Sequence, residues 1–437
     1  FGFGAIAHAA KVKPCCYQMH ALKTSQLGQI MVFITLKLAA PKVNTMKTIL
    51  PLFVACLGFL STSAQTKFFE GTWKEAAAEA KLQNKYLFVD CFTDWCYWCK
   101  VADKETFPDK LVGDFLNENF VAVQVDMERE GVYLSMKYRV TGFPSFLVFS
   151  PDGSFISKFT GYTKENSEFV EKLKTAIETD VRPNYPSKIT DSVEFPSFYK
   201  SSFISKNGDQ KKRVNPEINE INKWFSKNQD YTSEQAWSLI YKFNVGDKAN
   251  NYFLDNLEIY ETKYGKSEVE DKLYALAYSK LDTALNTLKM EDLDVAIDFA
   301  GKYLGDGSED LKSVFLIQFY EATENWVGYI ERAEILIDKH GFENHLAEIN
   351  SYCWTIYLKT DLKDAMYLAR EWMKRAVETE LNYFYLDTYA AVLYKSGEYN
   401  EALSVIDKAI LVGKDNEQNV DESLALRDKI VSAIDGK

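Results

Sequence analysis

Histidine, clustered basic residues and cysteine are all scarce in this chain of 437 residues, and each scarcity excludes a class of function. The net charge is -12 and no long basic run occurs. Because phosphate binding depends on clustered lysine and arginine, we exclude nucleic acid as a partner. Beyond residue 64 there are two histidines, His340 and His345. A zinc site of four Cys or His ligands and a cysteine–histidine nucleophile pair therefore both lack partners, and we predict no metal.

The first 45 residues have no clear periodic pattern, and a segment with the features of a signal peptide follows them. The stretch MKTILPLFVACLGFLSTSAQ, which starts at Met46, combines a basic start, an apolar run and small residues that end at Ala64. The apolar run is too short to span a bilayer comfortably, so no membrane span is expected in the mature chain. We predict upstream translated sequence over 1–45, a signal peptide over 46–64, and export to the periplasm. Lipid attachment at Cys56, in Val-Ala-Cys, is the alternative.

Export changes what the cysteines can do. Of seven, the four that follow residue 64 are Cys91, Cys96, Cys99 and Cys353. A disulfide scaffold would need more, so a packed core must stabilise the protein. The chain is also too long for one compact core, and we expect two or more domains.

Helical and strand patterns alternate over residues 66–181. In order, they are the helix WKEAAAEAKL, the buried strand YLFVDC, the helix KLVGDFLNENF, the strand VAVQVD, the short helix GVYLSMKY, the strands SFLVFS and SFISKF around Pro-Asp-Gly, and the helix KENSEFVEKLKTAIE. This order predicts an α/β domain in which helices cover both faces of a mixed sheet.

Proline marks the end of this domain. Four of the ten prolines fall between Pro183 and Pro216, and none follows. Because proline breaks helices, we predict an irregular linker over 182–220 and a helical domain over 221–437.

Two segments of the helical domain repeat one outline. SYCWTIYLKTDLKDAMYLAREWM (351–373) precedes TYAAVLYKSGEYNEALSVIDKAI (388–410) by 37 residues. The second copy resembles tetratricopeptide repeats, including the G-x-Y-x-E-A element, although the usual period is 34. The resemblance implies helical hairpins that offer a surface to a client or partner. In this register Cys353 aligns with Ala390, so we predict a core position for it.

The stretch DWCYWCK (94–100) holds two cysteines three positions apart, which suits a disulfide, a zinc half-site or a redox couple. Zinc lacks further ligands, and a structural disulfide that closes so small a loop gains little stability. The setting favours redox chemistry, because a thiolate at a helix N-terminus is stabilised by the dipole and by free backbone N–H groups. Cys96 would be the exposed attacking thiol, and Cys99, one turn inward, the resolving thiol.

These residues lie in a longer match. FVDCFTDWCYWCK resembles the active-site strand and loop of the thioredoxin superfamily, and VTGFPSFLVFSPDGSFISKFTGY (140–162) resembles its cis-proline loop and hairpin. The resemblance covers roughly residues 67–180. It implies a nucleophile at Cys96, a resolving thiol at Cys99, an active-site wall at Trp95 and a cis proline at Pro144 that faces the disulfide. No cofactor beyond the redox-active disulfide is implied.

Further expectations concern residues in and around these two motifs. The backbone of Phe143 would pair with an extended substrate strand. Tyr97 and Trp98 stand where thioredoxin has Gly-Pro between its cysteines, so the reduction potential of thioredoxin cannot be assigned to this chain. These two aromatic side chains either contact substrate or pack over the edge of the active site. Asp90 would take the proton of the resolving cysteine, since a carboxyl desolvated at a strand end has a raised pKa. The alternative role for Asp90 is structural: an acid at the end of the strand that is hydrogen-bonded to a turn. By strand alternation Cys91 points the opposite way from Asp90 and is expected to be an inert buried thiol; a third redox partner is the alternative.

Together these features predict an exported thiol–disulfide oxidoreductase of the reductase or isomerase type. Its partners would be protein thiol or disulfide substrates, a redox donor or acceptor protein, and a protein bound by the helical repeats. The alternative is a non-catalytic scaffold in which the repeats bind a partner and the α/β domain is a module.

Overall fold

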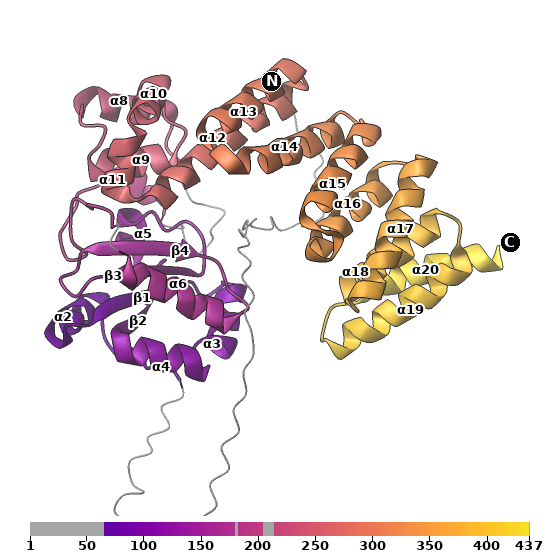
Figure 1. Ribbon diagram of the computed structural model, residues 1–437, viewed down its shortest axis with the longest axis horizontal. Coiled ribbons are helices and arrows are strands. Elements are labelled where there is room, and N and C mark those ends of the chain that lie inside the picture. Colours follow the sequence, from indigo (N-terminus) through magenta and orange to yellow (C-terminus); the bar gives the residue numbers. More distant parts are fainter. Residues whose placement is uncertain (1–64, 180–181, 204–213, 437) are drawn as a thin grey trace, which may run out of the picture. The chain divides into compact units, whose positions relative to one another are not determined.

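The computed structural model describes residues 65–179, 182–203 and 214–436 (Figure 1). The predicted upstream sequence, the signal peptide and Cys56 lie outside these residues. Within them the predicted fold class is confirmed, since an α/β region with a mixed sheet precedes a largely helical region. The domain boundaries themselves stay predictions.

The sheet has four strands in the order β2-β1-β3-β4. They are β1 (Tyr86–Phe92), β2 (Phe120–Asp126), β3 (Ser145–Phe149) and β4 (Phe155–Thr160). The central strand β1 runs parallel to β2 and antiparallel to β3. β3 and β4 form an antiparallel hairpin whose turn contains Gly153 at φ 85°, a left-handed conformation that glycine adopts without strain.

Side chains of β1 alternate between two apolar layers, one on each face of the sheet. Leu87, Val89 and Cys91 point into one layer, while Phe88 points into the other. The first layer is covered by α2 (Trp73–Gln83) and α5 (Val132–Lys137). The second is covered by α3 (Tyr97–Glu105), α4 (Lys110–Asn119) and α6 (Asn166–Glu178), and Figure 1 shows α6 across this face. Alternation therefore directs Asp90 to the layer of α3 and leaves Cys91 fully buried on the other side, as predicted.

Local sequence fixes where the helices of this region begin. Thr72 caps α2 by accepting a hydrogen bond from the Glu75 N–H, and the Glu75 carboxylate accepts one from the Thr72 N–H in return. Asp109 caps α4 by accepting from the N–H groups of Leu111 and Val112. Each cap satisfies backbone donors that the first helical turn leaves unpaired.

Helices make up the region after α6. They are α7 (Ser197–Ser201), α8 (Ile218–Lys227), α9 (Glu234–Lys242), α10 (Asp247–Asp255), α11 (Leu257–Tyr264), α12 (Lys266–Thr287), α13 (Met290–Tyr303), α14 (Ser308–Ala322), α15 (Trp326–His340), α16 (Leu346–Lys359), α17 (Lys363–Thr379), α18 (Tyr383–Lys395), α19 (Tyr399–Asp415) and α20 (Asp421–Asp435). From α12 to α19, consecutive helices pair as hairpins, which is consistent with the predicted repeats (Figure 1). Among the described residues, none of these helices combines the length and the apolar character needed to cross a membrane.

The two predicted repeat copies correspond to the hairpins α16–α17 and α18–α19. Cys353 and Ala390 are both fully buried in one continuous apolar cluster. The Cys353 sulfur lies 3.6 Å from the carbonyl oxygen of Ala369 on the neighbouring helix. The core position predicted for Cys353 is thus the position it occupies.

The described part of the predicted linker is packed rather than loose. Ile189 is fully buried in the apolar layer beneath α2 and α5. Tyr199 is also fully buried, and its hydroxyl donates a hydrogen bond of 2.9 Å to the carbonyl of Met136 in α5. Prolines in this segment exclude long helices, but they do not exclude burial of the large side chains between them.

Candidate functional site

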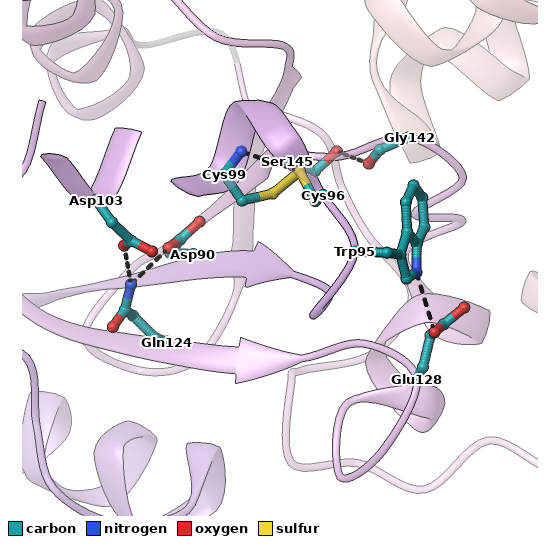
Figure 2. Close-up of a disulfide and its surroundings, with 9 residues drawn as sticks. All are labelled: Asp90, Trp95, Cys96, Cys99, Asp103, Gln124, Glu128, Gly142 and Ser145. Carbon is teal, nitrogen blue, oxygen red and sulfur yellow. Dashed lines mark hydrogen bonds between the residues drawn. A yellow bond between two sulfur atoms is a disulfide. The ribbon is translucent and has the colours of Figure 1, made fainter. Parts of the chain in front are cut away.

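A disulfide joins Cys96 and Cys99 at the start of α3, directly after β1 (Figure 2). Cys96 is the N-cap of this helix, and its sulfur accepts a hydrogen bond of 3.0 Å from the N–H of Cys99. Its own N–H donates to the carbonyl of Thr93 at 3.0 Å, which closes the loop that leaves the strand. The geometry therefore puts one sulfur where the unpaired N–H groups of a helix terminus point.

Exposure at the site differs from the expectation for Cys96. The sequence suggests that Cys96 is exposed, but Cys96 and Cys99 are 3% and 4% exposed in the disulfide form. The accessible surface here belongs to Trp95, Tyr97 and Trp98, which are 50%, 63% and 52% exposed. Both sulfurs are engaged with each other, and bulky neighbours take the solvent-facing positions.

Five aromatic side chains surround the disulfide loop, and we call them the aromatic rim: Trp95, Tyr97, Trp98, Phe143 and Tyr162. Trp98 stacks on Tyr162 with ring centroids 5.3 Å apart. Trp95 packs edge-on against Phe143, with ring centroids 5.7 Å apart. Figure 2 shows its indole N–H, which donates a hydrogen bond of 3.1 Å to Glu128. Tyr162 and Glu128 were not predicted as site residues. Tyr162 ends the stretch 140–162, but only Phe143 and Pro144 of that stretch were assigned to the site, and Glu128 lies outside both motifs.

The Trp95–Phe143 contact brings together the two motifs that lie far apart in the sequence. The peptide bond between Phe143 and Pro144 is cis. Hydrogen bonds fix the loop around it: the Ser145 hydroxyl donates to the Gly142 carbonyl at 2.8 Å, and the Gly161 N–H donates to the Pro144 carbonyl at 2.8 Å. The loop that precedes β3 is therefore held both within itself and to the end of β4.

Asp90 lies in β1, 2% exposed, on the side of the sheet that faces α3. Register places it opposite Gln124 of β2, whose amide donates to Asp90 at 3.0 Å and to Asp103 of α3 at 2.8 Å. In the view of Figure 2 the carboxylate lies on the Cys99 side of the disulfide. Gln124 and Asp103 were missed from the sequence; the signal was a single amide within the apolar strand VAVQVD.

Burial controls the acidity of this carboxyl. Desolvation raises the pKa of Asp90 to about 7, the hydrogen bond from Gln124 opposes the rise, and the negative charge of Asp103 adds to it. The other carboxylate oxygen, Oδ1, is buried without a hydrogen-bond partner among the described residues. A carboxyl with a free oxygen and a pKa near neutrality can accept and return a proton under physiological conditions.

The two remaining thiols in the described residues are poorly suited to reaction. Cys91 and Cys353 are fully buried, and burial raises the pKa of each thiol well above its ordinary value. Since the thiolate is the nucleophile, both stay inert near neutral pH. The described part of the chain also holds no group of three or more His, Cys, Asp or Glu residues arranged to bind a metal.

Part of the chain is similar to known proteins. Residues 73–177 match the family model of a thioredoxin-like domain. The chain is 36% identical to a solved structure from Bacteroides thetaiotaomicron, described as a candidate disulphide-isomerase; the match covers 28% of this chain and 99% of that one, with a TM-score of 0.25. It is 33% identical over 108 residues to the thiol:disulfide interchange protein DsbD of Colwellia psychrerythraea, covering 23% of this chain and 17% of that protein.

A third relative is matched over a shorter stretch. Spermatogenesis-associated protein 20 of Rattus norvegicus is 42% identical over 55 residues, which is 13% of this chain and 7% of that protein. The chain therefore spans less than a fifth of the length of these curated relatives.

Proposed function

We propose that this chain, which belongs to the thioredoxin-like family through residues 73–177, is a thiol–disulfide oxidoreductase that acts on protein disulfides. The observation that carries the proposal is the Cys96–Cys99 disulfide at a helix N-terminus, with the buried Asp90 of raised pKa in the strand before it. Neither metal nor organic cofactor is needed, because the disulfide itself is the electron carrier.

The reduced couple would act in two steps. Cys96 reacts as a thiolate, stabilised by the N–H of Cys99 and the helix terminus, and attacks one sulfur of a substrate disulfide. The substrate bond breaks, its second sulfur leaves as a thiolate, and a mixed disulfide with Cys96 remains.

Cys99 then completes the exchange. Its thiol transfers a proton to Asp90, and the resulting thiolate attacks the Cys96 sulfur, which releases the second substrate thiolate and forms the Cys96–Cys99 disulfide. The substrate gains two electrons and the couple loses them. A dithiol donor protein resets the couple by the same steps in reverse, and an isomerase would instead return the bond to a different pair of substrate sulfurs.

The aromatic rim and the cis-proline loop would hold the substrate. The rim exposes Trp95, Tyr97 and Trp98 next to the disulfide, and large rigid aromatics contribute much of the contact energy at protein interfaces. The backbone of Phe143 would pair with an extended substrate segment. Export, supported by the signal-like residues 46–64, would place the reaction in the periplasm, and the helical hairpins would recruit a client or partner.

Reduction of insulin by a dithiol tests the proposal, with Cys96→Ser and Cys353→Ala as a matched pair. Cys96→Ser should fall to the rate of the dithiol alone, because no mixed disulfide can form. Cys353→Ala replaces a cysteine with the residue of the second repeat copy and should keep the full rate. Wild-type turnover no faster than that of Cys96→Ser would refute catalysis and support the scaffold alternative.

A further inference from the structure

A buried ion cluster joins the helical region to the thioredoxin-like domain. Glu268, near the start of α12, lies 2.7 Å from the guanidinium of Arg139 and 2.9 Å from the amine of Lys158. The three side chains are 0–7% exposed. Arg139 directly follows the α5 region and Lys158 lies in β4, so a single carboxylate of one region pairs with two cations of the other.

Further polar contacts fix the cluster. The Arg139 guanidinium also donates to the Lys137 carbonyl at 2.8 Å and to the Ser238 hydroxyl at 3.3 Å. The Trp237 indole N–H donates to Glu268 at 3.1 Å. Burial works to raise the pKa of Glu268, but the charges of Arg139 and Lys158 outweigh it and hold the pKa below the ordinary value. The carboxylate is therefore ionised, and removal of its charge would leave two cations buried without their counterion.

Both charged groups lie next to the start of the cis-proline loop, since the Lys158 amine also donates to the carbonyl of Tyr138 at 3.2 Å. The backbone of Lys158 belongs to β4, the strand that supports the end of the loop. Arg139 has a φ of 53°, an uncommon left-handed conformation for a residue with a side chain, and the loop toward Pro144 starts with the next residue. Lys158 lies opposite Leu147 in the β3–β4 register. Two residues farther along β4, Thr160 shares a 2.7 Å hydrogen bond with Ser145, which follows the proline.

Glu268 thus connects the residue that enters the loop to the strand that supports its exit. We propose that Glu268 is a positioning residue for disulfide exchange: through Arg139 and Lys158, the helical region holds the cis-proline loop in the conformation that receives the substrate backbone. This inference rests on the proposed function, because only a loop that binds substrate needs to be held in one conformation for disulfide exchange. It gives α12 a role in the redox domain, so that α12 is not only a helix of an independent module.

The test compares two full-length variants altered on the same helix. Glu268→Gln keeps the shape of the side chain and removes the charge. Lys272→Met, one turn farther along α12, also removes a buried charged group. The Lys272 amine donates a hydrogen bond of 3.0 Å to the carbonyl of Phe243, which lies inside the helical region. Both variants lose a buried polar interaction, so a difference between them reports the connection to the loop and not a general loss of stability.

Two readouts are needed. The first is amide hydrogen exchange over residues 140–143, which should accelerate in Glu268→Gln and stay at the wild-type rate in Lys272→Met. The second is insulin-reduction kinetics, where Glu268→Gln should raise KM by roughly tenfold with little change in kcat, because a displaced loop weakens substrate binding more than sulfur chemistry. The alkylation rate of Cys96 in the reduced protein should not change.

The outcomes separate the two proposals. Unchanged exchange over 140–143 in folded Glu268→Gln, or equal effects of both substitutions, would overturn the positioning role whatever the turnover. Accelerated exchange without wild-type turnover above Cys96→Ser would refute the proposed function and leave the loop connection intact. If Glu268→Gln does not fold, Lys158→Met retains the Arg139–Glu268 pair and should produce the same changes to a smaller extent.

Discussion

The two regions of the molecule place the same chemical group in opposite surroundings. In the thioredoxin-like domain, Cys96 caps α3 by accepting a hydrogen bond from the Cys99 N–H, and the ionisable carboxyl of Asp90 is buried in the strand that precedes the helix. In the repeats, Cys353 lies in the interior of α16, where the backbone donors of the helix are already used and small residues let helices approach. A thiol is reactive or inert according to the backbone donors and charges nearby, so position in the helix separates Cys96, the proposed nucleophile, from the buried Cys353.

Buried polar groups also differ between the two regions. In the thioredoxin-like domain, the buried Asp90 accepts a hydrogen bond from Gln124, which also contacts the exposed Asp103; burial of this carboxyl costs stability and, in the proposed mechanism, provides the proton acceptor. The apolar cluster of the last repeats is built largely from aliphatic, alanine and aromatic side chains. The comparison predicts that substitutions in the first set change the reaction, whereas substitutions in the second change stability alone.

The largest effect is expected from Asp90→Asn on the rate of exchange. The amide cannot accept the proton of Cys99, so turnover at pH 7 should fall by about 100-fold, the usual contribution of a general base. The wild-type rate of the resolving step should rise with pH through about 7, where burial places the Asp90 pKa. In Asp90→Asn this inflection should be absent from single-turnover measurements between pH 5 and 9. A variant that keeps the inflection would assign the proton to another group.

Asp90→Asn, which should lower the rate of exchange, should at the same time raise the stability of the folded protein at high pH. The folded-state pKa of about 7 lies above the unfolded value of about 3.9, so between these pH values the folded protein holds one proton more. Stability is therefore lost as pH rises from about 4 to 7, by at most about 4 kcal/mol. Urea unfolding measures this effect. The free energy of unfolding of Asp90→Asn, relative to that of the wild type, should be higher at pH 8 than at pH 4. An advantage that does not grow with pH would mean that Asp90 is not desolvated as described.

Sequence patterns predicted the elements of this site better than the contacts between them. The strand that carries Asp90 and the helix that starts at the cysteines follow from apolar periodicity and from the loop between them. Gln124 could not be recognised in the same way, because its contact with Asp90 depends on strand register. Glu268 is still harder to find: it lies 129 residues from Arg139 in the chain, and neither residue belongs to a motif.

An intermediate effect, on stability alone, is expected from Ile356→Ala in the repeats. Ile356 is fully buried in α16, so the cavity should destabilise the protein by about 2–5 kcal/mol. Leu358→Ala, two residues along the same helix at an exposed position, should change stability by about 0.5 kcal/mol or less. Urea unfolding followed by helical circular dichroism measures both. Insulin reduction under conditions where both variants are folded should match the wild type, and a loss confined to Ile356→Ala would show that the last repeats take part in exchange.

The smallest effect is expected from substitution of Tyr97, a single exposed side chain of the aromatic rim. Tyr97 contacts Trp98 edge-on at 5.2 Å, while Trp98 is held on its other side by Tyr162. Tyr97→Ser should therefore leave the free energy of unfolding within about 0.5 kcal/mol of the wild type, as for other surface substitutions.

Its kinetic effect depends on whether the ring meets substrate. If the aromatic rim binds protein chains, Tyr97→Ser should lower kcat/KM for insulin by roughly threefold, since a peripheral contact contributes under about 1 kcal/mol. Turnover of a small disulfide such as oxidised glutathione, which cannot span the rim, serves as the control and should stay unchanged. Equal losses for both substrates would place the effect on the Cys96–Cys99 couple itself. No loss for either would mean that Tyr97 only covers Trp98, and substrate contact would then rest on Trp95, Trp98 and Phe143.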